Sequence, residues 1–259
     1  MGLGDVEGVV VSVPALPGEL LADQTRALRL MERAVQVAAP VQFVGLGSVL
    51  AAVAGRGAAL EEACGIPVTT GNAATAWTAA EITRRVAAGR PVAVLGGRGA
   101  VGRAIAEQIE GAVLDPADVR AFPVVVGAST TGGVLSPEAL GPGATLVDVA
   151  LPPTLTGPPA PGVTVLAGES LALAPGWRRD AWGHAFHVVA GYGWRSVYAC
   201  LLEPLLALRT DRRAPFAQGR RVRAEDVRAF GEAAISAGFA PEVRRLRVSS
   251  APASGKEGV

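Results

Sequence analysis

The segment from Val94 to Ser129 limits the possible fold most strongly, because it places a strand, a glycine-rich turn and a helix in immediate succession. Val92 to Leu95 is an apolar run typical of a buried strand, and Gly99 to Ile109 has the apolar spacing of a helix. A strand that leads through glycines into a helix is typical of the nucleotide-binding α/β folds.

The glycines of this turn fit two registers. Gly97, Gly99 and Gly102 make G-x-G-x-x-G, whereas Gly96, Gly99 and Gly102 make G-x-x-G-x-x-G. In both, glycine permits the tight turn, brings backbone N–H groups close to a pyrophosphate, and lets the helix pack on its strand. We predict a Rossmann-type turn, and the alternative is a structural turn that binds nothing.

Asp115 lies 18 residues after Gly97, close to the offset of about 20 residues at which an acid binds the ribose of NAD. Val124 follows only nine positions later, whereas a crossover with its own helix needs at least about 10–12 residues. Either Ala112 to Leu114 is a strand with a clipped return, or that strand is deleted. A ribose-binding Asp115 would favour NADH over NADPH by repelling a 2′-phosphate.

Further apolar runs extend this pattern into a parallel sheet. Strands are expected at 9–13, 41–44, 66–68, 123–127, 144–148 and 163–166, and helices at 19–37, 72–88, 194–208 and 224–237. The predicted fold class is α/β, with a truncated Rossmann-like parallel sheet and a second, discontinuous α/β lobe. Residues 76–190 would form the nucleotide lobe, residues 1–75 plus 191–248 the substrate lobe, and residues 249–259 a disordered tail.

Composition excludes several classes of function. The net charge is +1 and Lys256 is the only lysine, so nucleic-acid binding, Walker-type phosphate binding and Schiff-base chemistry in the core are not expected. No apolar run approaches the roughly 20 residues of a membrane helix. We expect a cytoplasmic protein. We also expect no metal site, because His184 and His187 have no accompanying cluster of ligands.

The run WRSVYACLLEPLLAL contains the strongest catalytic candidates. Cys200 and Glu203 are three residues apart and share one face of the expected helix. Pro204 removes the N–H that would bond to the Cys200 carbonyl, so the helix is expected to bend or open there. The alternative is a small buried thiol in an apolar helix, which is the usual state of free cysteine.

Five stretches carry a resemblance to the cyanobacterial aldehyde-forming acyl-carrier-protein reductases. They are LPGELLADQTRALRLMERAV with the following VGLGSVLAAV, then VTTGNAATAW, VAVLGGRGAVGRAI, VYACLLEPLL and VRAFGEAAISAGFAP. They occur in the family's order and cover most of residues 14–241. The chain departs from the family in lacking its N-terminal extension, about one strand and helix after the glycine turn, and its Asp-Gly-Gly-Tyr stretch.

The resemblance implies a reductase of acyl thioesters, bound to acyl carrier protein or CoA, that releases an aldehyde through a Cys200 acyl-enzyme and hydride from NADPH or NADH. Glu203 stands where the family also has an acid. A homo-oligomer is a further expectation. Thr70, Gly71 and Asn72 match the family's cleft motif. The candidate cofactor residues are Gly96, Gly97, Gly99, Ala100, Val101, Gly102, Asp115 and Ser129. Two alternatives remain: a cofactor-independent cysteine acyltransferase or thioesterase, and a non-catalytic binding subunit.

Overall fold

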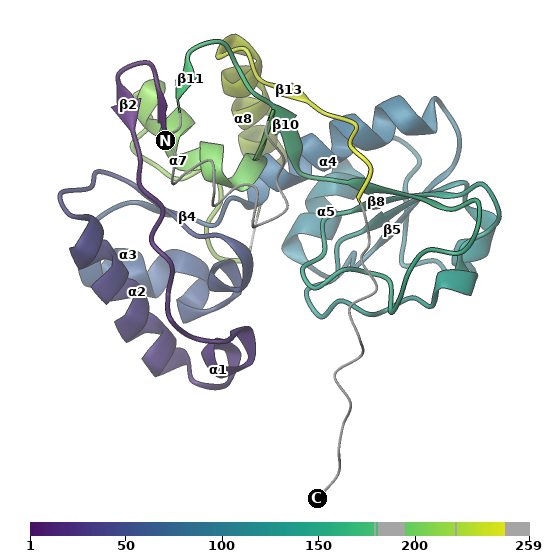
Figure 1. Ribbon diagram of the computed structural model, residues 1–259, viewed down its shortest axis with the longest axis horizontal. Helices are drawn as coiled ribbons and strands as arrows, with labels where there is room; N and C mark the ends of the chain where they lie inside the picture. The colour runs from purple at the N-terminus through teal and green to yellow at the C-terminus, as the bar shows by residue number, and fades with distance from the viewer. Residues whose placement is uncertain (179, 181–194, 221, 247–259) are drawn as a thin grey trace, which may run out of the picture.

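The computed structural model describes residues 1–178, 180, 195–220 and 222–246. It is a mixed α/β protein in which a parallel sheet of five strands lies beside a helical half (Figure 1). The α/β class expected from the sequence is therefore confirmed. In the described part of the chain no helix has the length and apolarity needed to cross a membrane.

The parallel sheet holds the strands that follow the long helix. They are β5 (Val92–Leu95), β6 (Val113–Leu114), β7 (Val124–Gly127), β8 (Thr145–Asp148) and β9 (Thr164–Ala167), in the spatial order β6-β5-β7-β8-β9. The chain order reverses at β5, which pairs with both β6 and β7. In such sheets ligands bind outside the carboxyl ends of the strands at this reversal.

The short distance between the glycine turn and the next long strand has a simple explanation. β6 is present, but it has only two residues, both exposed, at the edge of the sheet. Its return to β7 passes through a single 3-10 turn, η3 (Val119–Ala121), in place of a full helix. Of the two alternatives, the strand with a clipped return is correct.

Helices cover one face of the sheet and loops cover the other. Val92, Val94, Val124 and Val126 belong to the same core as α4 (Asn72–Ala87) and α5 (Ala100–Glu107). The opposite face buries Ala93 and Val125 under residues from η3, from the loop after η4 (Pro137–Ala139) and from the proline-rich loop before β9. This half of the molecule is consequently thinner than a doubly wound sheet with helices on both faces.

The alanine-rich helix α4 lies in the middle of the molecule (Figure 1). It packs on β7, β8 and α5 on one side and on α7 (Ala199–Arg209) and α8 (Ala224–Ser236) on the other. Its small residues permit these close packings, and Gly231 of α8 approaches Trp77 so closely that an added Cβ would lie 2.2 Å from the indole nitrogen. α4 thereby fixes α7 relative to the sheet.

The N-terminal half has a second core. It is built by α1 (Pro17–Ala22), α2 (Gln24–Ala38), η1 (Ser48–Ala52), η2 (Ala54–Gly57) and α3 (Ala58–Cys64). A parallel pair, β3 (Val44–Gly45) and β4 (Val68–Thr69), connects this core to α7. Met31, Val53 and Leu60 are among its buried side chains.

Two small antiparallel sheets complete the described structure. One contains β1 (Gly2–Leu3), β2 (Val6–Glu7) and β11 (Trp177–Arg178), and the other β10 (Ser170–Ala172), β12 (Ser196–Tyr198) and β13 (Ala240–Pro241). β12 ends directly before α7, so its pairing with β10 sets where that helix begins. These sheets join segments that are distant in the sequence.

Five expected elements differ from the structure, two of them because the strands expected at 41–44 and 66–68 overlap β3 and β4 by one residue each. Residues 9–13 are not in a strand. The helix expected over 19–37 is divided into α1 and α2 at Asp23, whose side chain accepts a hydrogen bond from the N–H of Arg26. The helix expected from residue 194 begins at Ala199, and α7 runs through Pro204 as a single helix. The division into two lobes stays a prediction, and residues 249–259 lie outside the described residues.

Candidate active site

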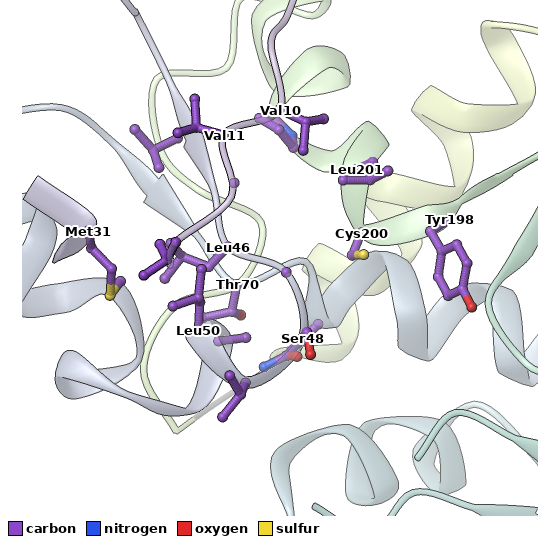
Figure 2. A pocket seen from close by; sticks show the side chains of 18 of the residues that line it. Val10, Val11, Met31, Leu46, Ser48, Leu50, Thr70, Tyr198, Cys200 and Leu201 are labelled. Carbon is purple, nitrogen blue, oxygen red and sulfur yellow. The ribbon is translucent and has the colours of Figure 1, made fainter. Parts of the chain in front are cut away.

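A cleft of about 1990 Å³ opens between the N-terminal half, α7 and the carboxyl edge of the parallel sheet. Figure 2 shows Cys200 between Tyr198 on one side and Thr70 and Leu46 on the other. Most of the wall is apolar and comes from the segment 9–13, α2, η1 and α7. Thr70, Asn72, Thr75, Glu169 and Cys200 form one polar group in the lining (the polar end), and other polar side chains, among them Ser48, Arg56 and Ser129, line the rest of the cleft. The cleft therefore suits a ligand with an apolar body and a polar end.

Cys200 is held at this polar end by close packing of two backbones. Gly71 has φ +72°, and a Cβ built on it would lie 2.4 Å from the Cβ of Cys200 and 2.9 Å from its Cα. Only glycine permits that approach in the left-handed conformation. Gly71 also precedes the first residue of α4, so the Thr-Thr-Gly-Asn sequence places the start of α4 against the start of α7.

Glu203 lies one turn after Cys200 but points away from the cleft. Its side chain is fully buried, accepts a hydrogen bond from the Thr69 hydroxyl and accepts another from the N–H of Ala74 at 3.0 Å. Burial raises the pKa of Glu203 to about 7, against the opposing effect of these hydrogen bonds. Glu203 joins β4, α4 and α7 and does not line the cleft.

Glu169 is a second carboxylic acid near Cys200, and the sequence analysis did not predict it. It lies in the tight turn between β9 and β10, and its backbone carbonyl accepts the N–H of Ala199, the residue before Cys200. The Thr75 hydroxyl donates a hydrogen bond to its carboxyl at 3.4 Å. Desolvation raises the pKa of Glu169 to about 8, and the nearby Asp148 carboxylate acts in the same direction. At neutral pH Glu169 is mostly a neutral acid.

These acids determine the state of the thiol. Burial raises the pKa of Cys200 well above its usual value of 9, and the neighbouring Glu169 and Glu203 raise it further. A cysteine nucleophile acts as the thiolate, which cationic neighbours or helix N-termini usually stabilise. Cys200 lies in the first turn of α7, where N–H groups lower the pKa of the thiol, but burial and the two acids outweigh this effect and favour the protonated thiol. His184 and His187 lie outside the described residues.

The glycine turn forms the opposite rim of the cleft. Gly99, Ala100, Val101 and Ser129 are lining residues, and all belong to the predicted cofactor set. Packing requires glycine at three further positions of the turn. An added Cβ on Gly96 would lie 2.7 Å from the Ala128 carbonyl oxygen, on Gly97 2.5 Å from the Leu114 side chain, and on Gly102 2.4 Å from the Gly96 oxygen.

Asp115 is also part of the turn. Its carboxyl accepts a hydrogen bond from the N–H of Gly96 at 2.7 Å, and its own N–H donates to the Val94 carbonyl. The carboxylate thus closes the loop between β5 and β6. The glycine pattern and the acid that follows it are explained by this βα turn without a bound nucleotide.

The sequence prediction missed Glu169, Thr75 and Tyr198. Glu169 lies 31 residues before Cys200 in the chain, and no local pattern marks it. Its position could have indicated a role, because Glu169 follows Gly168 in a turn directly after an apolar strand. Side chains in such turns reach the carboxyl edge of the sheet. Among the residues that the structure describes, no group of three His, Cys, Asp or Glu side chains could hold a metal ion.

Comparison with known proteins changes the functional interpretation. No family model matches the chain. The chain is 26% identical to Aminotransferase PigE of Serratia sp. (strain ATCC 39006) over an alignment that covers 90% of this chain and 32% of that protein. It spans about a third of the length of this curated relative.

A solved structure of a 5,10-methylenetetrahydrofolate dehydrogenase from the silkworm Bombyx mori matches 32% of this chain and 37% of that one. The identity is 23% and the TM-score is 0.24. At that level of structural similarity the match supports no conclusion about fold or function.

The expected reductase function is wrong on this comparison. A curated protein that matches 90% of the chain carries the name of an aminotransferase, which overturns the resemblance to acyl-carrier-protein reductases and the acyl-thioester oxidoreductase activity drawn from it. The same comparison overturns the expectation that NADPH or NADH is the cofactor. It also overturns the acyltransferase, thioesterase and binding-subunit alternatives. The raised pKa of the Cys200 thiol and the packing roles of Gly96, Gly97 and Gly102 agree with this correction.

Proposed function

We propose that this chain is the carbonyl-activating component of an amino-transfer system. It binds an apolar aldehyde or ketone in the cleft and presents the carbonyl group, at the polar end beside Cys200, to the amine that takes part in the transfer. The observation that carries the proposal is the similarity to an aminotransferase over 90% of this chain. Amino transfer interconverts an amine and a carbonyl compound, so its catalysts must bind the carbonyl partner.

Pyridoxal phosphate is the cofactor that an aminotransferase implies, and it is held by a lysine as a Schiff base. None of the residues that the structure describes is a lysine, and the single lysine of the chain, Lys256, lies beyond them. The described lining of the cleft contains arginine but no lysine. The residues of the cleft therefore do not fit this cofactor, and we assign it no role here.

The composition of the cleft supports a carbonyl ligand. Val10, Leu46, Leu50 and Leu201 line the apolar part, and burying hydrocarbon there is favourable by about 25 cal/mol per Å². A few polar groups converge at the polar end, as in most small-molecule sites. A carbonyl oxygen accepts hydrogen bonds and carries no charge, so it can enter a buried site without the desolvation cost of an ion.

Binding and condensation measurements test the proposal. The full chain is titrated with 2-nonanone by calorimetry at pH 7, and its effect on oxime formation from nonanal and methoxyamine is followed by gas chromatography. We expect saturable ketone binding and faster condensation. Leu46→Trp, which fills the apolar part, should weaken both, whereas Val37→Trp, at an exposed position of α2 outside the cleft, should leave both unchanged.

Two results would overturn the proposal. The first is a chain that neither binds the ketone nor accelerates condensation. The second is a chain that, given pyridoxal phosphate and an amine donor, catalyses amino transfer alone and forms a borohydride-reducible adduct. Reduction followed by mass spectrometry should show no adduct, or one at Lys256 that Lys256→Ala removes without affecting ketone binding.

A further inference from the structure

We propose that Glu169 is the acid of this site, and that it donates a hydrogen bond, and then its proton, to the carbonyl oxygen of the bound compound. The inference rests on the proposed function. It assigns the acid role to a residue of the turn between β9 and β10 and leaves Glu203, the acid of the cysteine helix, with a structural role.

The position of Glu169 distinguishes it from the other acids. Glu169 and Cys200 both line the cleft, whereas Glu203 does not, and Asp148 uses its carboxyl oxygens to accept hydrogen bonds from Ala150 and Thr154. Among the residues that the structure describes, the Thr75 hydroxyl donates to the Glu169 carboxyl at 3.4 Å, which is long. Its carboxyl thus keeps hydrogen-bonding capacity for a ligand.

The backbone fixes Glu169 beside the thiol. Its carbonyl accepts the N–H of Ala199 at 3.0 Å, and the Gly168 N–H donates to the Asp148 carbonyl. The turn is consequently anchored to α7 on one side and to β8 on the other. A group held in this way needs little reorganisation to meet an oxygen atom at the polar end of the cleft.

Acidic groups act on Glu169 from the neighbouring elements. Asp148 of β8 raises the pKa of Glu169, which in turn raises that of Cys200 on α7, while α4 contributes the neutral hydroxyl of Thr75. Arg178 and Asp180 also line the cleft. This surrounding acidity together with burial keeps the Glu169 proton in place at neutral pH, since the pKa is raised to about 8.

The chemical step needs only the amine, the carbonyl compound and the Glu169 acid. The nitrogen lone pair of a primary amine forms a bond to the carbonyl carbon, and the π pair of the C=O bond moves to oxygen, which takes the proton of Glu169. The Glu169 carboxylate then removes a proton from the nitrogen. The product is a neutral amino alcohol, and no oxidant or reductant is required.

The pH dependence of 2-nonanone binding tests the assignment by calorimetry from pH 6 to 9.5. The carbonyl binds the protonated acid, so affinity should be constant below pH 7.5 and fall about tenfold per pH unit above pH 8. Glu169→Gln keeps an N–H donor and should bind without this pH dependence, and Glu169→Ala should bind weakly throughout. Glu62→Gln, at an exposed position outside the cleft, should follow the wild type.

The possible failures are distinguishable. Ketone binding that is independent of pH in the wild type, or a Glu169→Gln variant with the wild-type pH dependence, overturns the role of Glu169 and leaves the proposed function standing. Absence of ketone binding at every pH overturns both. Thermal unfolding of each variant identifies a variant that has lost its fold, and in that event the wild-type profile alone decides the assignment.

Discussion

Replacing Gly71 by alanine tests the contact on which the geometry of the site depends. Gly71 has φ +72°, and the added Cβ would lie 2.4 Å from the Cβ of Cys200 and 2.9 Å from its Cα. A left-handed conformation costs a non-glycine residue about 1–2 kcal/mol. Overpacking adds about 1–3 kcal/mol, because α7 must move away from the start of α4. The expected loss in free energy of unfolding is about 2–5 kcal/mol.

Gly65 provides the matched control. It has φ +66°, nearly the same backbone conformation, but a Cβ there would meet nothing within 4 Å. Gly65→Ala should therefore lose only the conformational part, about 1–2 kcal/mol. Urea unfolding monitored by circular dichroism gives both values, and Gly71→Ala should also lose ketone binding. Equal losses of stability in the two variants would refute the close packing of Cys200 against Gly71.

Two other substitutions probe the buried acids by urea unfolding. The raised pKa of Glu203 means that the folded protein holds this proton more tightly than the unfolded chain, so stability should be highest near pH 4.5 and fall by about 3 kcal/mol from this group as pH rises to 7. Glu203→Gln should flatten that decline, and an unchanged decline would contradict the assignment. Asp226 is buried and pairs with Arg212 and Arg223; Asp226→Asn should cost about 2 kcal/mol or more. Glu225→Gln, which removes an exposed pair with Arg223, should cost less than about 1 kcal/mol, and similar costs for the two would disprove the distinction.

The sequence predicts the parallel sheet well because its longer strands are short apolar runs rich in valine and threonine. Val92–Leu95 matches β5, and the strands expected at 123–127, 144–148 and 163–166 are displaced by one residue at most at either end. The two-residue strands β1, β2 and β13 have no such signal, since tertiary pairing alone makes them strands. The break at Asp23 has a local cause, an N-cap, that periodicity does not reveal.

The candidate site was predicted in part. The placement of Thr70, Asn72 and Cys200 at one cleft stays consistent with the structure, because the Thr-Thr-Gly-Asn turn and the cysteine helix each carry a local pattern. Glu169 does not, because its neighbours Thr75 and Cys200 come from α4 and α7. The glycine turn misled the functional interpretation, since the same glycines serve dinucleotide binding and simple βα packing.

Photo-crosslinking tests the central claim most directly, that the cleft beside Cys200 and Glu169 binds an apolar carbonyl compound. An aliphatic methyl ketone with a terminal diazirine is irradiated with the full chain, and the adducts are mapped by peptide mass spectrometry. The account predicts adducts on the apolar lining at 44–50 and 201–208, suppressed by excess 2-nonanone. Adducts confined to apolar residues outside the cleft, such as the exposed Val113 and Leu114, or adducts that 2-nonanone does not suppress, would contradict it.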